Sequence, residues 1–170
     1  MDTAYKTTLE LDKVLARAVQ LCACQETKEM MQALEPAPTV EDERYDLAQT
    51  NAINALLIKN GSPRFGSVHE VRRIVAHARK GGILSMGELL EIAATLRNFS
   101  GLSQWYGLSE HEMLPTDDLF FSLAPQPVLE KQISESILSP EEMADTASVT
   151  LHDLRRKIRQ TVDSIRTKLD

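Results

Sequence analysis

Glycine placement constrains the fold of this chain more than any other feature. Five of its seven glycines lie between positions 61 and 87, in a stretch whose apolar residues otherwise recur at helical spacing. Glycine ends helices and opens turns because it lacks a Cβ and adopts backbone conformations that other residues avoid. The pattern therefore predicts an antiparallel helical assembly with short, well-marked turns.

Capping signals mark the expected helix boundaries. A Thr or Ser followed three residues later by an acidic residue satisfies the free amides of a helical first turn. Helix C-termini are expected at Gly61 and at the Gly81-Gly82 pair. The start signal occurs at 7–10, 39–42, 67–70 and 85–88. The third of these would place His69 and His77 on one helix, either as a basic surface with the neighbouring arginines or as an ordinary solvated face.

The C-terminal part of the chain predicts one long amphipathic helix. Prolines separate short helical pieces after Trp105, and residues 133–148 are expected to connect them to the last helix, with a small hairpin. We therefore expect a helical core (1–132), a connecting segment and the start of a long helix (149–170). Its apolar stripe, close to a heptad seam, consists of Leu151, Leu154, Ile158, Val162, Ile165 and Leu169. No Gly or Pro ends this helix, so we expect the natural protein to continue.

Charge and composition narrow the class of protein. The net charge is −6, and the last 20 residues hold six Lys or Arg and three Asp, so the basic tail follows a body that carries −9. An acidic body argues against a general nucleic-acid coat. We find no apolar run long enough to cross a membrane and no secretory signal, so a cytoplasmic protein is expected.

No residue pattern predicts catalysis, a cofactor or a metal in this chain. A phosphate-binding loop would need GxxxxGK[ST], which is absent from the sequence. Cys22 and Cys24 lack the second ligand pair of a zinc site, and Cys22 continues an apolar helical face. No catalytic triad, carboxylate dyad or nucleophile–base pair stands out.

Two groups of residues are candidates for an interface. Arg155, Arg156 and Arg159 cluster early in the last helix, and they would either contact nucleic-acid phosphate or form a solvated face. The constrained loop of Ser62, Pro63, Arg64, Phe65 and Gly66 is either a docking loop for another domain or a helix connection with Phe65 in the core.

Four stretches together resemble the N-terminal region of the MutS-two family, the MutS-like proteins of the second bacterial branch. They are TLELDKVL, ALEPAPTVEDE, NGSPRFGSVHEV and KGGILSMGELLEIAATLR. The DTAS run before the basic last helix also fits. Family members usually have the sequence Gly-Ser-Pro-Pro-x-Gly-Gly at the loop. This chain has Arg64 and Ser67 in place of two of those residues, so its loop geometry is expected to differ from that of the family.

The resemblance implies that the chain is an all-α core and lever region of a larger homodimeric protein. Such proteins carry an ATPase that uses ATP and magnesium, and usually a C-terminal nuclease domain. They suppress homologous recombination through branched DNA and split collided ribosomes. Both chemistries would lie beyond residue 170, so no catalytic residue transfers to this chain. The alternative from the residues alone is a self-contained helical adaptor whose last helix pairs with a partner helix.

Overall fold

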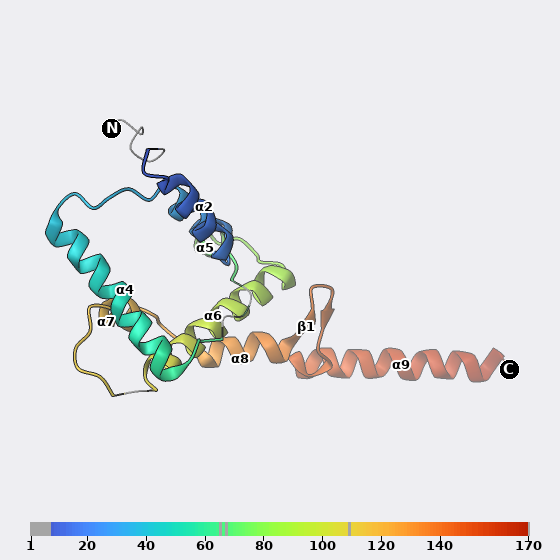
Figure 1. Cartoon of the computed structure of the whole chain (residues 1–170). Coiled ribbons are helices and arrows are strands. Elements are labelled where there is room, and N and C mark those ends of the chain that lie inside the picture. Colours follow the sequence, from blue (N-terminus) through green and yellow to red (C-terminus); the bar gives the residue numbers. More distant parts are fainter. Residues whose placement is uncertain (1–7, 65, 67, 109, 170) are drawn as a thin grey trace. The chain divides into compact units, whose positions relative to one another are not determined.

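The computed structural model describes residues 8–64, 66, 68–108 and 110–169 and is mostly helical (Figure 1). This agrees with the predicted all-α class. The described helices are α2 (Leu11–Leu21), α3 (Gln25–Gln32), α4 (Val40–Asn60), α5 (Arg72–Arg79), α6 (Met86–Tyr106), α7 (Asp117–Phe121), α8 (Pro127–Ser136) and α9 (Val149–Leu169).

A short hairpin interrupts the helices between α8 and α9. Strand β1 (Ile137–Ser139) pairs antiparallel with β2 (Glu142–Met143), with Ile137 opposite Met143 and an irregularity in register before Ser139. A 3-10 turn, η1 (Asp145–Ala147), then leads into α9. The hairpin expected within 133–148 is therefore present.

The chain divides into two compact units. The first combines Met1–Glu70 with Asn98–Pro125, and the second combines Val71–Arg97 with Gln126–Asp170. Helix α6 contributes residues to both. Each unit has an apolar cluster of its own.

The first unit has an aromatic core. Leu56, Trp105 and Tyr106 are 4%, 7% and 3% exposed, because the end of α4 and the end of α6 present their apolar faces to one another. The Trp105 indole donates a hydrogen bond to the Gly61 carbonyl at 2.8 Å. Phe120 stacks on Tyr106, with ring centroids 3.9 Å apart and planes 5° apart.

The second unit has an aliphatic core. Ala93, Ile133 and Ile137 are buried together, so α6, α8 and β1 share one apolar interior. Arg97 reinforces the packing of α6 on α8, because its guanidinium donates to Glu130 Oε1 at 2.5 Å. Both cores are small, which leaves many apolar side chains at the surface.

Helix boundaries follow the capping signals in the middle of the chain. The Thr39 hydroxyl accepts from the Asp42 amide at 3.1 Å and begins α4, and Gly61 follows the last residue of that helix. Ser85 and Glu88 form a reciprocal capping box, with Ser85 N to Glu88 Oε2 at 2.8 Å and Glu88 N to Ser85 Oγ at 3.3 Å. These boundaries confirm the predictions made from spacing.

The glycine pair after α5 forms a Schellman motif. The Gly82 amide donates to the His77 carbonyl and the Gly81 amide to the Ala78 carbonyl, at 3.1 and 2.9 Å. Gly81 has φ of +81°, and a Cβ at Gly82 would overlap the His77 imidazole. Both positions therefore require glycine, the first for its backbone angle and the second for the ring packed above it.

The predicted helix start at 67–70 is wrong, since α5 begins at Arg72. Gly66 is held by a hydrogen bond to Asn98, and residues 68–71 carry the chain from that anchor to α5. His69 therefore precedes the helix and does not share a helical face with His77. The start signal at 7–10 cannot be compared in full, because Thr7 lies outside the described residues; Glu10 provides no side-chain cap to α2.

Replacing Ser85 by alanine is expected to lower the free energy of unfolding by about 1 kcal/mol, because the first turn of α6 loses its hydroxyl cap. Chemical denaturation followed by circular dichroism measures this change. Ser164→Ala is the matched control, since among the described residues its hydroxyl bonds only the Gln160 carbonyl of its own helix. Equal stability of the two variants would contradict the assignment of the cap.

Candidate functional site

One carboxylate holds the base of α9. Asp145 lies in η1, where its Oδ1 accepts from Arg155 Nη1 at 2.5 Å and its Oδ2 accepts from Arg159 Nη2 at 3.0 Å. Arg155 also donates to the Met143 carbonyl in β2 at 2.8 Å. Ser148 caps the helix by accepting from the Leu151 amide at 3.1 Å. We call this hydrogen-bonded set of β2, η1 and the first turns of α9 the α9 junction.

The two arginines keep Asp145 ionised. Hydrogen bonds from Arg155, and then from Arg159, hold the pKa of the Asp145 carboxyl below its ordinary value of 3.8. The Asp145 and Arg155 side chains are 36% and 34% exposed, so the pair is partly shielded from solvent. At neutral pH the junction is therefore a charge-assisted contact between η1 and α9.

All three arginines proposed to contact phosphate take part in ion pairs. Arg155 and Arg159 meet on Asp145, whereas Arg156 pairs with Asp153 of the same helix at 3.3 Å. Successive helical residues turn by about 100°, so Arg156 lies about 100° around the helix from Arg155, and in the structure it pairs with a different carboxylate. The structure thus brings two of the three together, and their contact with phosphate stays a prediction.

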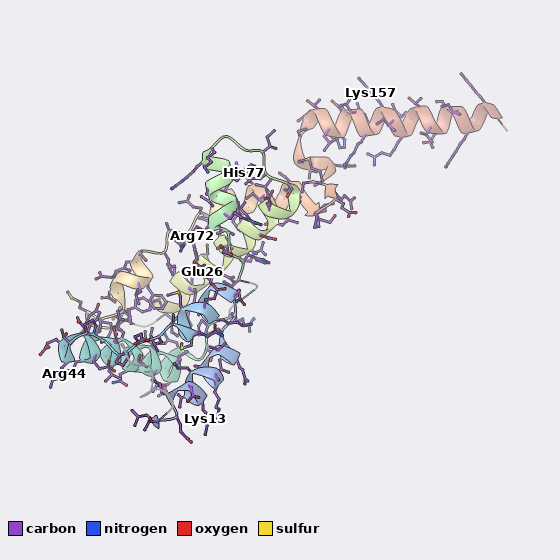
Figure 2. All side chains as sticks on the ribbon, turned by 90° about the horizontal axis from the view of Figure 1, so that it is seen from above. Lys13, Glu26, Arg44, Arg72, His77 and Lys157 are labelled. Atoms are coloured by element: carbon purple, nitrogen blue, oxygen red, sulfur yellow. The ribbon has the colours of Figure 1, made fainter. Side chains whose placement is uncertain are left out.

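The apolar stripe of α9 is exposed over most of its length. Leu154, Ile158, Val162 and Ile165 are 53%, 62%, 43% and 53% exposed, and Leu151 near the junction is partly buried. The Leu169 side chain lies outside the described residues. Within the described part of its own unit, no element lies alongside the distal half of α9, which carries side chains on all sides beyond Lys157 (Figures 1 and 2).

The predicted docking loop is tied down at both ends. The Gly61 carbonyl before it accepts from Trp105, and the Gly66 amide donates to Asn98 Oδ1 at 2.9 Å. A Cβ at Gly66 would lie 2.8 Å from that oxygen, which accounts for the glycine. Between the anchors Ser62 and Arg64 are exposed and Pro63 is half-buried. Phe65 lies outside the described residues, so its placement in the core or at the surface stays open.

A polar network beside the aromatic core was missed by sequence reasoning. The Tyr106 hydroxyl donates to Asp117 Oδ1 at 2.6 Å and lies 2.8 Å from Thr116 Oγ1. Asp117 Oδ2 accepts from the Leu114 amide at 3.2 Å. Burial, with the Asp117 carboxylate nearby, raises the pKa of Tyr106. The phenol therefore stays protonated and acts as a donor that fixes the α6–α7 connection. No spacing in the sequence signals this network, because it joins two helix ends through a loop.

Neither cysteine belongs to a metal site in the described part of the chain. Those residues contain no group of three or more His, Cys, Asp or Glu side chains placed to hold a metal. Cys22 Sγ donates to the Ala18 carbonyl, and Cys24 Sγ lies 3.0 Å from Thr27 Oγ1. Among the described helices, none is both long and apolar enough to cross a membrane.

Comparison with known proteins adds a relationship. No family model matches the chain. It is 32% identical over 172 residues to a protein of Ruminiclostridium cellulolyticum, and 31% identical over 168 residues to one of Acetivibrio thermocellus; both are named Endonuclease MutS2. A third Endonuclease MutS2, from Clostridium beijerinckii, is 29% identical over 163 residues. The chain is related to the MutS-two proteins.

The relationship covers nearly all of this chain but little of its relatives. The matches include 95% to 100% of the chain and 21% to 22% of the relatives. The chain thus spans about a fifth of the length of the curated relatives it matches. The name Endonuclease describes those whole proteins, whose activity need not reside in the matching fifth.

Proposed function

We propose that this chain is the core and lever region of a MutS-two-like protein, with a mechanical rather than a catalytic role. One observation carries the proposal: α9 is fixed to its unit at the α9 junction, and its apolar side chains beyond the junction are exposed. A helix held at one end transmits displacement of its base to its far end. Similarity to Endonuclease MutS2 proteins supports the same interpretation.

The geometry of α9 suits such a role. Its 21 residues span about 30 Å at a rise of about 1.5 Å per residue. Asp145 contacts two arginines one helical turn apart, so it restrains both the position and the rotation of the first turns. Motion of the unit would then reach the far end of α9 without bending at the junction.

The full-length parent would supply the chemistry. By the resemblance, it would be a cytoplasmic homodimer with an ATPase that uses ATP and magnesium, and with a nuclease domain. Its role would be to suppress recombination through branched DNA and to split collided ribosomes. Reading the coding frame beyond Asp170 tests this parentage. A GxxxxGK[ST] run downstream is expected, and a stop codon directly after Asp170 would overturn it.

A self-contained adaptor is the second candidate function, and the exposed stripe of α9 favours it. Its apolar residues at helical spacing would fit one partner helix. The two candidates differ in the sequence they require after α9, since a lever of this family must be followed by the ATPase, whereas an adaptor need not be. If the reading frame ends, recovery of one defined helical partner that is lost on Ile158→Asp would support the adaptor.

The 170-residue chain is expected to bind no ATP and to bind branched DNA only weakly. It has no phosphate-binding loop, and Arg155 and Arg159 are engaged by Asp145. Calorimetry with magnesium-ATP, and fluorescence anisotropy of a labelled four-way junction across a salt series, measure the two affinities. Weak binding through phosphate contacts would fall further as salt rises. Sub-micromolar DNA binding that persists at high salt would therefore contradict the expectation of weak binding.

A further inference from the structure

An open groove with apolar walls lies in the first unit between α2, the α3–α4 connection and the first half of α4. Its volume is about 830 Å³. Leu15 of α2, Leu34 of the connection and Leu47 of α4 all line it. Leu34 and Leu47 are 53% and 54% exposed. A partner that covered these side chains would gain the free energy of burying apolar surface.

The dimensions of the groove suit a helix. Val40 and Thr50 of α4 both line it, and they are ten positions apart. Ten residues of helix rise about 15 Å, which equals about three turns of a second helix lying alongside. Leu11 and Leu15, one turn apart, line the groove from α2. A helix whose apolar side chains recur every three or four residues fits between two such faces.

The wall formed by the α3–α4 connection is restrained. The connection runs extended between the two helices (Figure 1), and Pro36 and Pro38 restrict its backbone on either side of Ala37. The Ala37 amide donates to Glu43 Oε2 at 3.4 Å, which joins the connection to α4. The groove is therefore formed before a partner arrives, so little ordering of the chain opposes binding.

The rim of the groove is acidic. Every ionisable side chain that lines it is a carboxylic acid: Glu35, Glu43 and Asp46. The Asp46 carboxylate forms no ion pair or hydrogen bond with a described residue, and Glu43 accepts only the Ala37 amide. Such a rim repels nucleic-acid phosphate and acidic peptides, whereas it attracts lysine and arginine side chains.

We propose that the groove binds an amphipathic helix of another protein, about three turns long, with lysine or arginine beside its apolar stripe. The apolar side chains of this partner cover Leu34 and Leu47, and its flanking cations face Glu43 and Asp46. Apolar burial and charge thus select the same occupant. The contact goes beyond the proposed function and does not depend on it, because it uses the first unit alone.

Synthetic peptides test the contact by fluorescence anisotropy with the 170-residue chain. The probe is a labelled peptide of leucine and lysine with about 18 residues, long enough to form a helix, and its leucines recur at intervals of three and four. It is expected to bind. A peptide of the same composition whose leucines do not share one helical face is expected not to bind. Neither is a peptide with glutamate in place of lysine, because the acidic rim repels it.

Two variants of the chain examine charge and apolar burial separately. The rim variant, Glu43→Lys with Asp46→Lys, is expected to weaken binding of the leucine–lysine probe by about tenfold or more. The same variant is expected to gain binding of the leucine–glutamate peptide. Leu47→Ser leaves the charge unchanged, and it is expected to weaken binding of the probe by about tenfold through lost apolar contact.

Matched controls separate the contact from net charge and from folding. Glu41→Lys with Glu112→Lys makes the same change in charge within the first unit, but neither residue lines the groove. Ile58→Ser is the control for Leu47→Ser, because Ile58 is 79% exposed on α4 and also lies outside the lining. Both controls should bind the probe as the natural chain does. Circular dichroism checks that every variant keeps its helix content.

Each outcome either supports or overturns the contact. A reversed peptide preference in the rim variant, with both controls unchanged, supports it. Equal loss of binding in the Glu41 and Glu112 control would overturn it, because net charge alone would then explain the binding. Equal binding of the peptide without an apolar face would also overturn it. So would a natural chain that does not bind the probe, and sedimentation would then show whether a second copy fills the groove instead.

Discussion

Trp105→Ala is expected to lower the free energy of unfolding by about 3–5 kcal/mol, the usual cost of removing a buried aromatic side chain. Trp105 is 7% exposed and packs with Leu56 in the core of the first unit. The substitution also removes the indole donor from the Gly61 carbonyl. Urea denaturation followed by circular dichroism measures the loss.

Phe121→Ala is the control for this experiment. Phe121 lies 16 residues further on in the same unit and is 73% exposed, so its removal should change stability by less than about 0.5 kcal/mol. If the two alanine variants were equally stable, Trp105 could not be the centre of the core. A second check comes from the loop, since losing the bond to Gly61 should speed amide exchange at residues 61–64.

Asp145→Asn is expected to loosen the α9 junction without unfolding either unit. The amide keeps the shape of the carboxylate but loses the charge that holds Arg155 and Arg159. Amide exchange across residues 145–155 should accelerate several-fold, while exchange in the cores of both units stays unchanged. Asp163→Asn is the matched control on α9, because Asp163 forms no ion pair with a described residue.

The same contact has a defined pH dependence. The pKa of Asp145 is lowered in the folded chain, so its stabilisation is fully present above the ordinary value of 3.8 and is lost as the pH falls through the lower folded value. Carboxyl chemical shifts in a magnetic-resonance titration report both the midpoint and the release of α9. A midpoint at or above 3.8 would show that the arginines do not hold this carboxylate in solution.

Some features of the fold could be predicted because they depend on residues close together in the chain. The cap at Thr39, the box at Ser85 and the turn at Gly81-Gly82 each involve partners within five positions. The backbone geometry of a helix end fixes such contacts, so spacing alone predicts them. The signal at 67–70 failed, because Asn98 anchors the preceding loop from 32 positions away.

The candidate site also combines features that spacing predicts with features that only the tertiary structure sets. Spacing identified the stripe and the arginines of α9, but not the role of Asp145, which lies 10 and 14 residues before its partners.

The sequence by itself determined the helical class, most of the turns and the amphipathic character of α9, because these depend on local backbone preference and on the period of apolar residues. Only the tertiary structure decided which charges meet. It placed Asp145 against two arginines and Tyr106 against Asp117. Charged residues look alike along a chain, and their effect depends on distance and burial, which packing alone sets.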